Sequence, residues 1–171
     1  MRTMMTMAVA FGLIAHWTVG ESRPTNSFGI YLFAEAPSRS NWMSRALSPK
    51  PLISDADIVT YAFTNHLLTL TPEAAQRIAH FRMPQLTEPF IVVANGERIY
   101  RGALVSSSCS QSFALPSITL WGSQQFTIHT NLPPNSVLID RTYAEPFSQT
   151  GPDPRSDERI RRALDALRKL K

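Results

Sequence analysis

The stretch from Leu67 to Leu104 reads LLTLTPEAAQRIAHFRMPQLTEPFIVVANGERIYRGAL and decides the fold. Its first leucines alternate with threonine, as in a short half-buried strand. Thr71-Pro72 then supplies an N-cap hydroxyl and the proline that a first helical position tolerates. After Pro84, two apolar runs flank Asn95-Gly96, which suits a type I′ turn because both residues tolerate positive φ. The stretch predicts a strand, a helix and an antiparallel hairpin.

The helix predicted between Thr71 and Pro84 is amphipathic. Residues at three- and four-residue spacing form its apolar face, and they are Ala74, Ala75, Ile78 and Phe81. Glu73 and Arg77 lie one turn apart on the opposite face. We expect a weak ion pair between them.

Shorter apolar runs predict the other strands. The run 28–34 has the length and composition of a central strand, and 58–61 returns to extended chain after one helical turn at 54–57. The runs 117–121 and 125–129 suggest a second hairpin, whereas 105–112 is too polar for a regular element. The pattern indicates one α+β domain over 27–171, with a mainly antiparallel sheet, one mid-chain helix and one C-terminal helix.

Proline interrupts the segment 131–154, so we expect no long element there. A C-terminal helix is predicted over 156–170, with Ser156 as its cap. Asp153 and Asp157 flank this start, and either capping or holding Arg155 would explain them, with capping favoured. The apolar stripe of the helix consists of Ile160, Ala163, Leu164, Leu167 and Leu170.

The net charge of +4 is confined to one region. Residues 1–154 contain ten basic and ten acidic residues, whereas 155–171 contain seven and three. No basic stripe with interleaved aromatic residues occurs, so we expect no nucleic-acid partner. The basic C-terminal helix leaves contact with a membrane surface as a secondary option.

Residues 1–20 resemble a secretory signal peptide, because one arginine precedes an apolar run and small residues lie near Gly20. No cysteine lies directly after the apolar run, so a lipid anchor at that position is not expected. The prediction is an extracytoplasmic protein, in the periplasm or secreted. If the apolar run instead belongs to the folded domain, the protein is cytoplasmic.

Cys109 is the only cysteine, which excludes an internal disulfide and a cysteine-rich zinc site. The four histidines show no metal-ligating spacing. We therefore expect no metal and no cofactor.

From 51 to 112 the sequence resembles the head subdomain of the first periplasmic domain of the protein-export subunit SecD. Three segments carry the resemblance: PLISDADIVTYA, LLTLTPEAAQRI and PFIVVANGERIYRGALV. In that family, a strand running into LTPEGA is followed by a helix and by two strands joined at an Asp/Asn-Gly turn. The membrane spans and base subdomain of SecD have no counterpart here. The resemblance implies an extracytoplasmic α+β module that contacts polypeptide, without export activity.

Two functional hypotheses follow. The first is an interaction module that binds another envelope protein or polypeptide, with Arg98, Tyr100 and Arg101 as candidate binding residues because an aromatic ring between guanidinium groups can stack and bind carboxylates. The alternative is a hydrolase or transferase that uses a serine or Cys109 in the loop 106–112. No G-x-S-x-G elbow surrounds these serines. We favour the module and expect no enzymatic activity.

Overall fold

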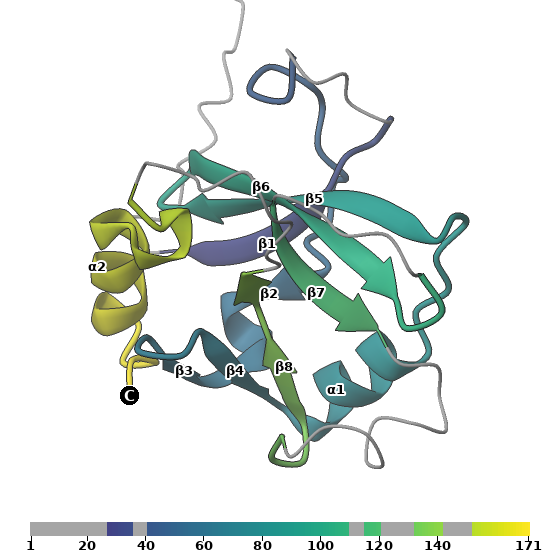
Figure 1. The fold of residues 1–171 in the computed structure, drawn as a ribbon. Coiled ribbons are helices and arrows are strands. Elements are labelled where there is room, and N and C mark those ends of the chain that lie inside the picture. The colour runs from purple at the N-terminus through teal and green to yellow at the C-terminus, as the bar shows by residue number, and fades with distance from the viewer. Residues whose placement is uncertain (1–26, 36–40, 110–114, 121–131, 142–151) are drawn as a thin grey trace, which may run out of the picture.

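The computed structural model describes residues 27–35, 41–109, 115–120, 132–141 and 152–171, which form two sheets flanked by helices (Figure 1). The larger sheet has the strand order β2-β1-β5-β6-β7-β9, and the smaller sheet has the order β3-β4-β8. The strands are β1 (Phe28–Leu32), β2 (Ile53–Ser54), β3 (Ile58–Ala62), β4 (Leu67–Leu70), β5 (Thr87–Ala94), β6 (Glu97–Ser106), β7 (Pro116–Leu120), β8 (Ser136–Leu138) and β9 (Asp140–Arg141). The helices are α1 (Pro72–Ala79) and α2 (Glu158–Ala166), and η1 (Asp55–Asp57) and η2 (Pro154–Ser156) are 3-10 turns.

Antiparallel pairing dominates both sheets, and among the named strands only β6 and β7 pair in parallel within the described residues. The α+β fold with a mainly antiparallel sheet is therefore confirmed. The predicted turn at Asn95-Gly96 joins β5 to β6 with φ values of 51° and 77°. These two positive φ values are what a type I′ turn requires.

Helix α1 begins where the sequence predicts. The Thr71 hydroxyl accepts a hydrogen bond from the Ala74 N–H at 3.2 Å, which satisfies one of the unpaired donors of the first turn. The helix ends at Ala79, before Pro84. The expected pair between Glu73 and Arg77 is not formed. Arg77 instead contacts Asp57 at 2.8 Å, and this contact ties α1 to η1.

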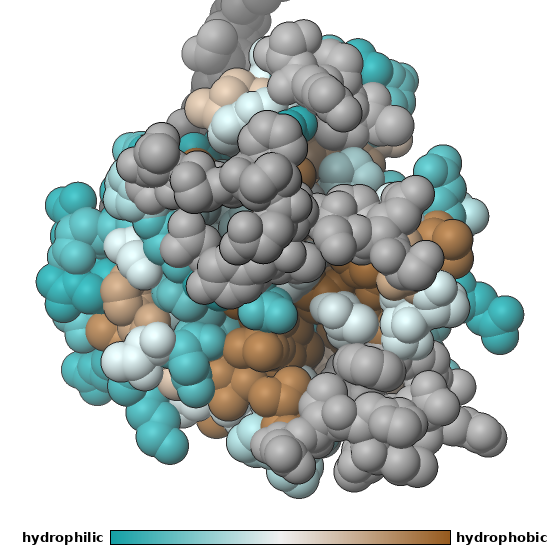
Figure 2. Space-filling view, in the orientation of Figure 1, coloured by the Kyte–Doolittle hydropathy of each residue, from teal (hydrophilic) through white to brown (hydrophobic). Residues whose placement is uncertain are grey.

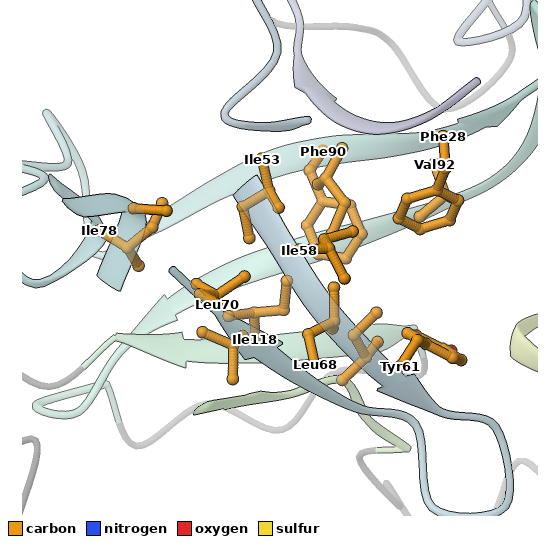
Figure 3. Packing of buried hydrophobic residues seen from close by; sticks show 14 of the residues in the cluster. Phe28, Ile53, Ile58, Tyr61, Leu68, Leu70, Ile78, Phe90, Val92 and Ile118 are labelled. Atoms are coloured by element: carbon orange, nitrogen blue, oxygen red, sulfur yellow. The ribbon is translucent and has the colours of Figure 1, made fainter. Parts of the chain in front are cut away.

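The core lies between the two sheets (Figure 3). Phe90 and Val92 of β5 face Leu68 and Leu70 of β4, and all four side chains are at most 1% exposed. Full burial of a side chain of this size contributes about 1.5–3 kcal/mol relative to exposure. Ile78 closes the core from α1, and the buried face of α2 consists of Ile160, Ala163 and Leu164.

The C-terminal helix differs from the prediction at both ends. Ser156 belongs to η2, and the Asp157 carboxylate caps α2 by accepting from the Arg159 N–H at 2.9 Å. The helix ends at Ala166, and Arg168 adopts a positive φ of 57° that turns the chain. Leu170 then forms a parallel β-bridge with Tyr61 of β3. The segment predicted as the last helical turn is therefore a turn followed by an isolated β-bridge to β3.

Strand β6 continues to Ser106, so the polar segment predicted to be irregular begins later than 105. Its last residues pair on one side with β5 and on the other with β7, and this pairing outweighs the weak hydrophobic pattern. The run 125–129 and the predicted signal peptide lie outside the described residues. The proline-rich segment contains the two short strands β8 and β9, and its described residues form no long element, as expected.

Gly102 offers a test of the packing inside the larger sheet. A Cβ added there would collide with the Phe90 ring and with the Pro116 carbonyl oxygen. We expect Gly102→Ala to destabilise the fold by about 1–3 kcal/mol, as overpacking does, measured by urea denaturation.

Gly29→Ala is the matched control, because its Cβ would meet chiefly the movable Tyr31 ring at 2.8 Å. We expect Gly29→Ala to lose less stability than Gly102→Ala. Equal losses at the two positions would contradict the packing described for Gly102.

Candidate functional site

A groove of about 410 Å³ lies where the end of α1 meets the ends of β6 and β7. Among the described residues, its lining contains no charged side chain and consists of Ile78, Ala79, Phe81, Met83, Pro84, Gln85, Leu86, Ser106 and Leu120. A groove of this size and character fits an apolar ligand or an apolar side chain of a partner. In the view of Figure 2, hydrophobic surface lies near the centre and hydrophilic surface covers α2 at the left.

The segment between α1 and β5 forms one wall of the groove. Helix α1 ends at Ala79, and the chain then runs through Met83 and Pro84 to Leu86. The Leu86 carbonyl oxygen accepts the Ser106 N–H at 2.9 Å, which fixes this wall to the end of β6. The Leu86 side chain is 58% exposed. Leu86 is thus an exposed apolar residue at a groove whose described lining is uncharged but partly polar.

The serine-rich loop begins at the same groove. The Ser106 and Ser108 hydroxyls are 2.8 Å apart and hydrogen-bond to each other, and the Cys109 N–H donates to the Ser106 carbonyl. Within residues 106–109, no side chain hydrogen-bonds to a histidine or a carboxylate. Ser110 and Ser112 lie outside the described residues. Ser106 is therefore the one serine of this loop that the structure places in the lining of the groove.

The three candidate residues of the hairpin have different surroundings. Arg98 donates to the carbonyl oxygens of Trp42 and Arg45 at 2.7 and 2.6 Å, so it holds the segment 41–45. Tyr100 is 5% exposed and packs against Phe90 in the core. Arg101 is half-buried and makes no ion pair in the described part of the chain. The structure therefore does not bring the three side chains together.

A β-bulge explains this separation. Val92 pairs with Tyr100 and Val93 pairs with Arg98, so Ile99 is an extra residue in β6. In a regular strand, residues two apart such as Arg98 and Tyr100 share a face. The extra residue breaks that alternation. Tyr100 consequently points into the core while Arg98 bonds to the outer segment.

Sequence reasoning missed a buried polar network that joins β3, the β3–β4 turn and η2. The Tyr61 hydroxyl lies 2.9 Å from His66 Nδ1, and His66 Nε2 lies 3.9 Å from Asp153 Oδ2. Asp153 accepts a forked contact from Arg155, with distances of 2.6–3.1 Å. Arg155 also donates to the Ile139 carbonyl at 2.7 Å. We call Tyr61, His66, Asp153 and Arg155 the buried network.

The electrostatics of the buried network favour a neutral His66. Burial lowers the pKa of His66 below its usual range, the positive charge of Arg155 lowers it further, and Asp153 opposes both effects. The hydrogen bonds from Arg155 hold the pKa of the Asp153 carboxyl below its usual value. Neutral His66 with its proton on Nε2 would accept the Tyr61 hydroxyl hydrogen at Nδ1. Asp153 thus holds Arg155, which is one of the two predicted roles, and it also accepts the Arg155 N–H at the start of η2, whereas Asp157 caps the helix α2.

Weak signals for the buried network were present in the sequence. Thr64-Asn65 before His66 predicts a turn, and His66 adopts a positive φ of 56° there, a conformation in which histidine is enriched. The spacing of Asp153 and Arg155 also suggested a contact. Nothing in the sequence places these two segments together, because they are far apart in the chain.

No group of three or more histidine, cysteine or acidic side chains within the described ranges could hold a metal ion. None of the described helices has the length and apolar character that crossing a bilayer requires.

No family model, curated protein or solved structure matches the chain.

Two tyrosines provide a matched test of the buried network. Tyr61→Phe removes the partner of His66 Nδ1 and leaves a buried acceptor unsatisfied, so we expect a loss of about 1–3 kcal/mol in the free energy of unfolding. The Tyr100 hydroxyl is buried without a hydrogen-bond partner in the described structure. Tyr100→Phe should therefore be neutral or stabilising. Chemical denaturation of both variants measures the difference, and a larger loss for Tyr100→Phe would contradict it.

Proposed function

We propose that the chain is an extracytoplasmic protein-interaction module that takes an apolar segment of another polypeptide into the groove beside α1. The observation that carries the proposal is the lack of charged side chains among the described residues that line the groove, together with the exposure of Leu86. Apolar side chains that a partner inserts into such pockets dominate the energetics of many interfaces. The resemblance of 51–112 to the SecD head subdomain supports polypeptide as the ligand class.

The three hairpin residues that the sequence suggests for partner binding differ in whether they are available for it. Arg98 is engaged with backbone carbonyls, and Tyr100 is in the core. We therefore propose Arg101 as the residue of this set that can meet a carboxylate of a partner. Contact of α2 with a membrane surface is the weaker proposal, because Arg159 and Arg161 are already paired with Glu97, Asp157 and Glu158.

The enzyme alternative has one observation in its favour, which is that Ser106 lines the groove. Nucleophilic catalysis needs a base within hydrogen-bond reach of the nucleophile, and the hydroxyl of Ser106 is bonded to Ser108 instead. Fluorophosphonate and iodoacetamide probes distinguish the two functions. Stoichiometric labelling of a loop serine or Cys109 that is lost on unfolding would count against the module and favour the enzyme.

For the groove, we expect Leu86→Asp to weaken binding of a permanently unfolded polypeptide, reduced and carboxymethylated α-lactalbumin, by at least about tenfold, or ~1.4 kcal/mol. The reason is that a carboxylate at the groove would lose its hydration when an apolar segment binds. Fluorescence anisotropy of the labelled polypeptide provides the measurement.

Met43→Asp is the matched control, because Met43 is 55% exposed and is not part of the groove lining. Its affinity should stay within about twofold of the unmodified protein. Equal effects of the two substitutions would show that binding does not involve the groove.

For the compartment, we expect protein recovered from an envelope fraction to have lost about the first twenty residues. Intact-mass spectrometry measures this directly. Recovery of the full-length chain from the cytoplasm would return the apolar run 4–19 to the folded domain.

A further inference from the structure

Strand β3 is an edge of the smaller sheet, and residues 168–171 cover part of that edge. We call these residues the covering segment. Tyr61 lies opposite Leu68 of β4, and its backbone is bonded on the other side of β3. There the Tyr61 N–H donates to the Lys169 carbonyl at 2.7 Å, and the Lys171 N–H donates to the Tyr61 carbonyl at 2.9 Å. The covering segment thus supplies the two hydrogen bonds that a neighbouring strand would otherwise make with Tyr61.

Apolar side chains lie at the same edge. Leu170 of the covering segment is half-buried and packs against the core where it bridges to Tyr61. The Val59 side chain of β3 is 47% exposed. Without the covering segment, β3 would present free backbone groups of Tyr61 beside an exposed apolar side chain, and an edge strand of this kind pairs readily with another strand.

The composition of the covering segment makes it a poor edge for further pairing. Three of its four residues are cationic, namely Arg168, Lys169 and Lys171. Within the described part of the chain, none of the three forms an ion pair. Charged side chains on an edge, lysine above all, are a usual means of preventing strands from associating. The covering segment therefore closes the β3 edge and leaves a charged edge in its place.

We propose that the β3 edge is a self-association surface whose partner is β3 of a second copy of this chain, and that the covering segment keeps two copies apart. The two strands pair antiparallel about a two-fold axis, with the Tyr61 N–H of each copy donating to the Tyr61 carbonyl of the other. Strand β3 reads IVTYA and carries no charged residue, so two copies of it meet without repulsion. With the covering segments in place, the Tyr61 backbone groups are occupied and the cations of the two copies repel each other.

Sedimentation velocity of a variant that ends at Leu167 tests the proposal. We expect this variant to form a dimer with a dissociation constant at least about tenfold lower than that of any self-association of the full chain. Amide hydrogen exchange locates the contact, because Tyr61 is the donor that loses its partner. Its amide should be unprotected in the dilute variant and become protected as the concentration passes the dissociation constant.

Val59 provides the matched controls in the shortened variant. Val59→Lys places a charge on the edge strand and should restore the monomer, whereas Val59→Thr keeps a β-branched side chain without charge and should remain a dimer. The proposal is overturned if the shortened variant is folded and monomeric. A dimer that survives Val59→Lys, or that leaves the Tyr61 amide unprotected, overturns it equally.

A pair of full-length variants decides if the shortened variant fails to fold. Lys171→Pro lacks the N–H that bonds to the Tyr61 carbonyl, whereas Lys171→Ala removes the same charge and keeps that N–H. We expect Lys171→Pro to self-associate more strongly than Lys171→Ala, by about threefold or more in the dissociation constant. Equal self-association of the two variants would contradict the proposal.

Discussion

The middle of the larger sheet depends on the absence of a side chain at Gly102. Phe90 and Gly102 are opposite each other in the β5–β6 pairing, and the phenylalanine ring fills the space that a Cβ would occupy. An aromatic ring over a cross-strand glycine restores the contact that the glycine lacks. The same absence lets the Pro116 carbonyl of β7 approach β6 closely. Strands β5, β6 and β7 can therefore form one continuous surface against the smaller sheet.

The sequence predicts those parts of the fold whose determinants are local. Thr71-Pro72 and Asn95-Gly96 each define their own backbone geometry, and both are found where expected. The length of α2 was predicted wrongly, because β3 pairs with a residue of the expected last helical turn. Leu170 is the clearest example, since its spacing fits the helical stripe but its backbone lies beside β3.

The candidate residues were harder to predict, because one inserted residue changes the side of the strand that a side chain occupies. The sequence around Arg98 and Tyr100 does not indicate that Ile99 is an extra residue in the strand pairing. The buried network depends on residues from three separate regions, and only the pair Asp153 and Arg155 is local. The groove was missed for the same reason, since its lining comes from α1, the following loop and two strand ends.

The bridge between Tyr61 and Leu170 joins residues that are 109 positions apart in the chain. Contacts of such long sequence separation form late, because the entropy of closing the loop must be lost before the contact contributes. Local elements such as the β5–β6 hairpin can form well before this bridge. The order of folding therefore leaves the β3 edge open during assembly, and the time spent in that state determines the risk of pairing with another newly made chain.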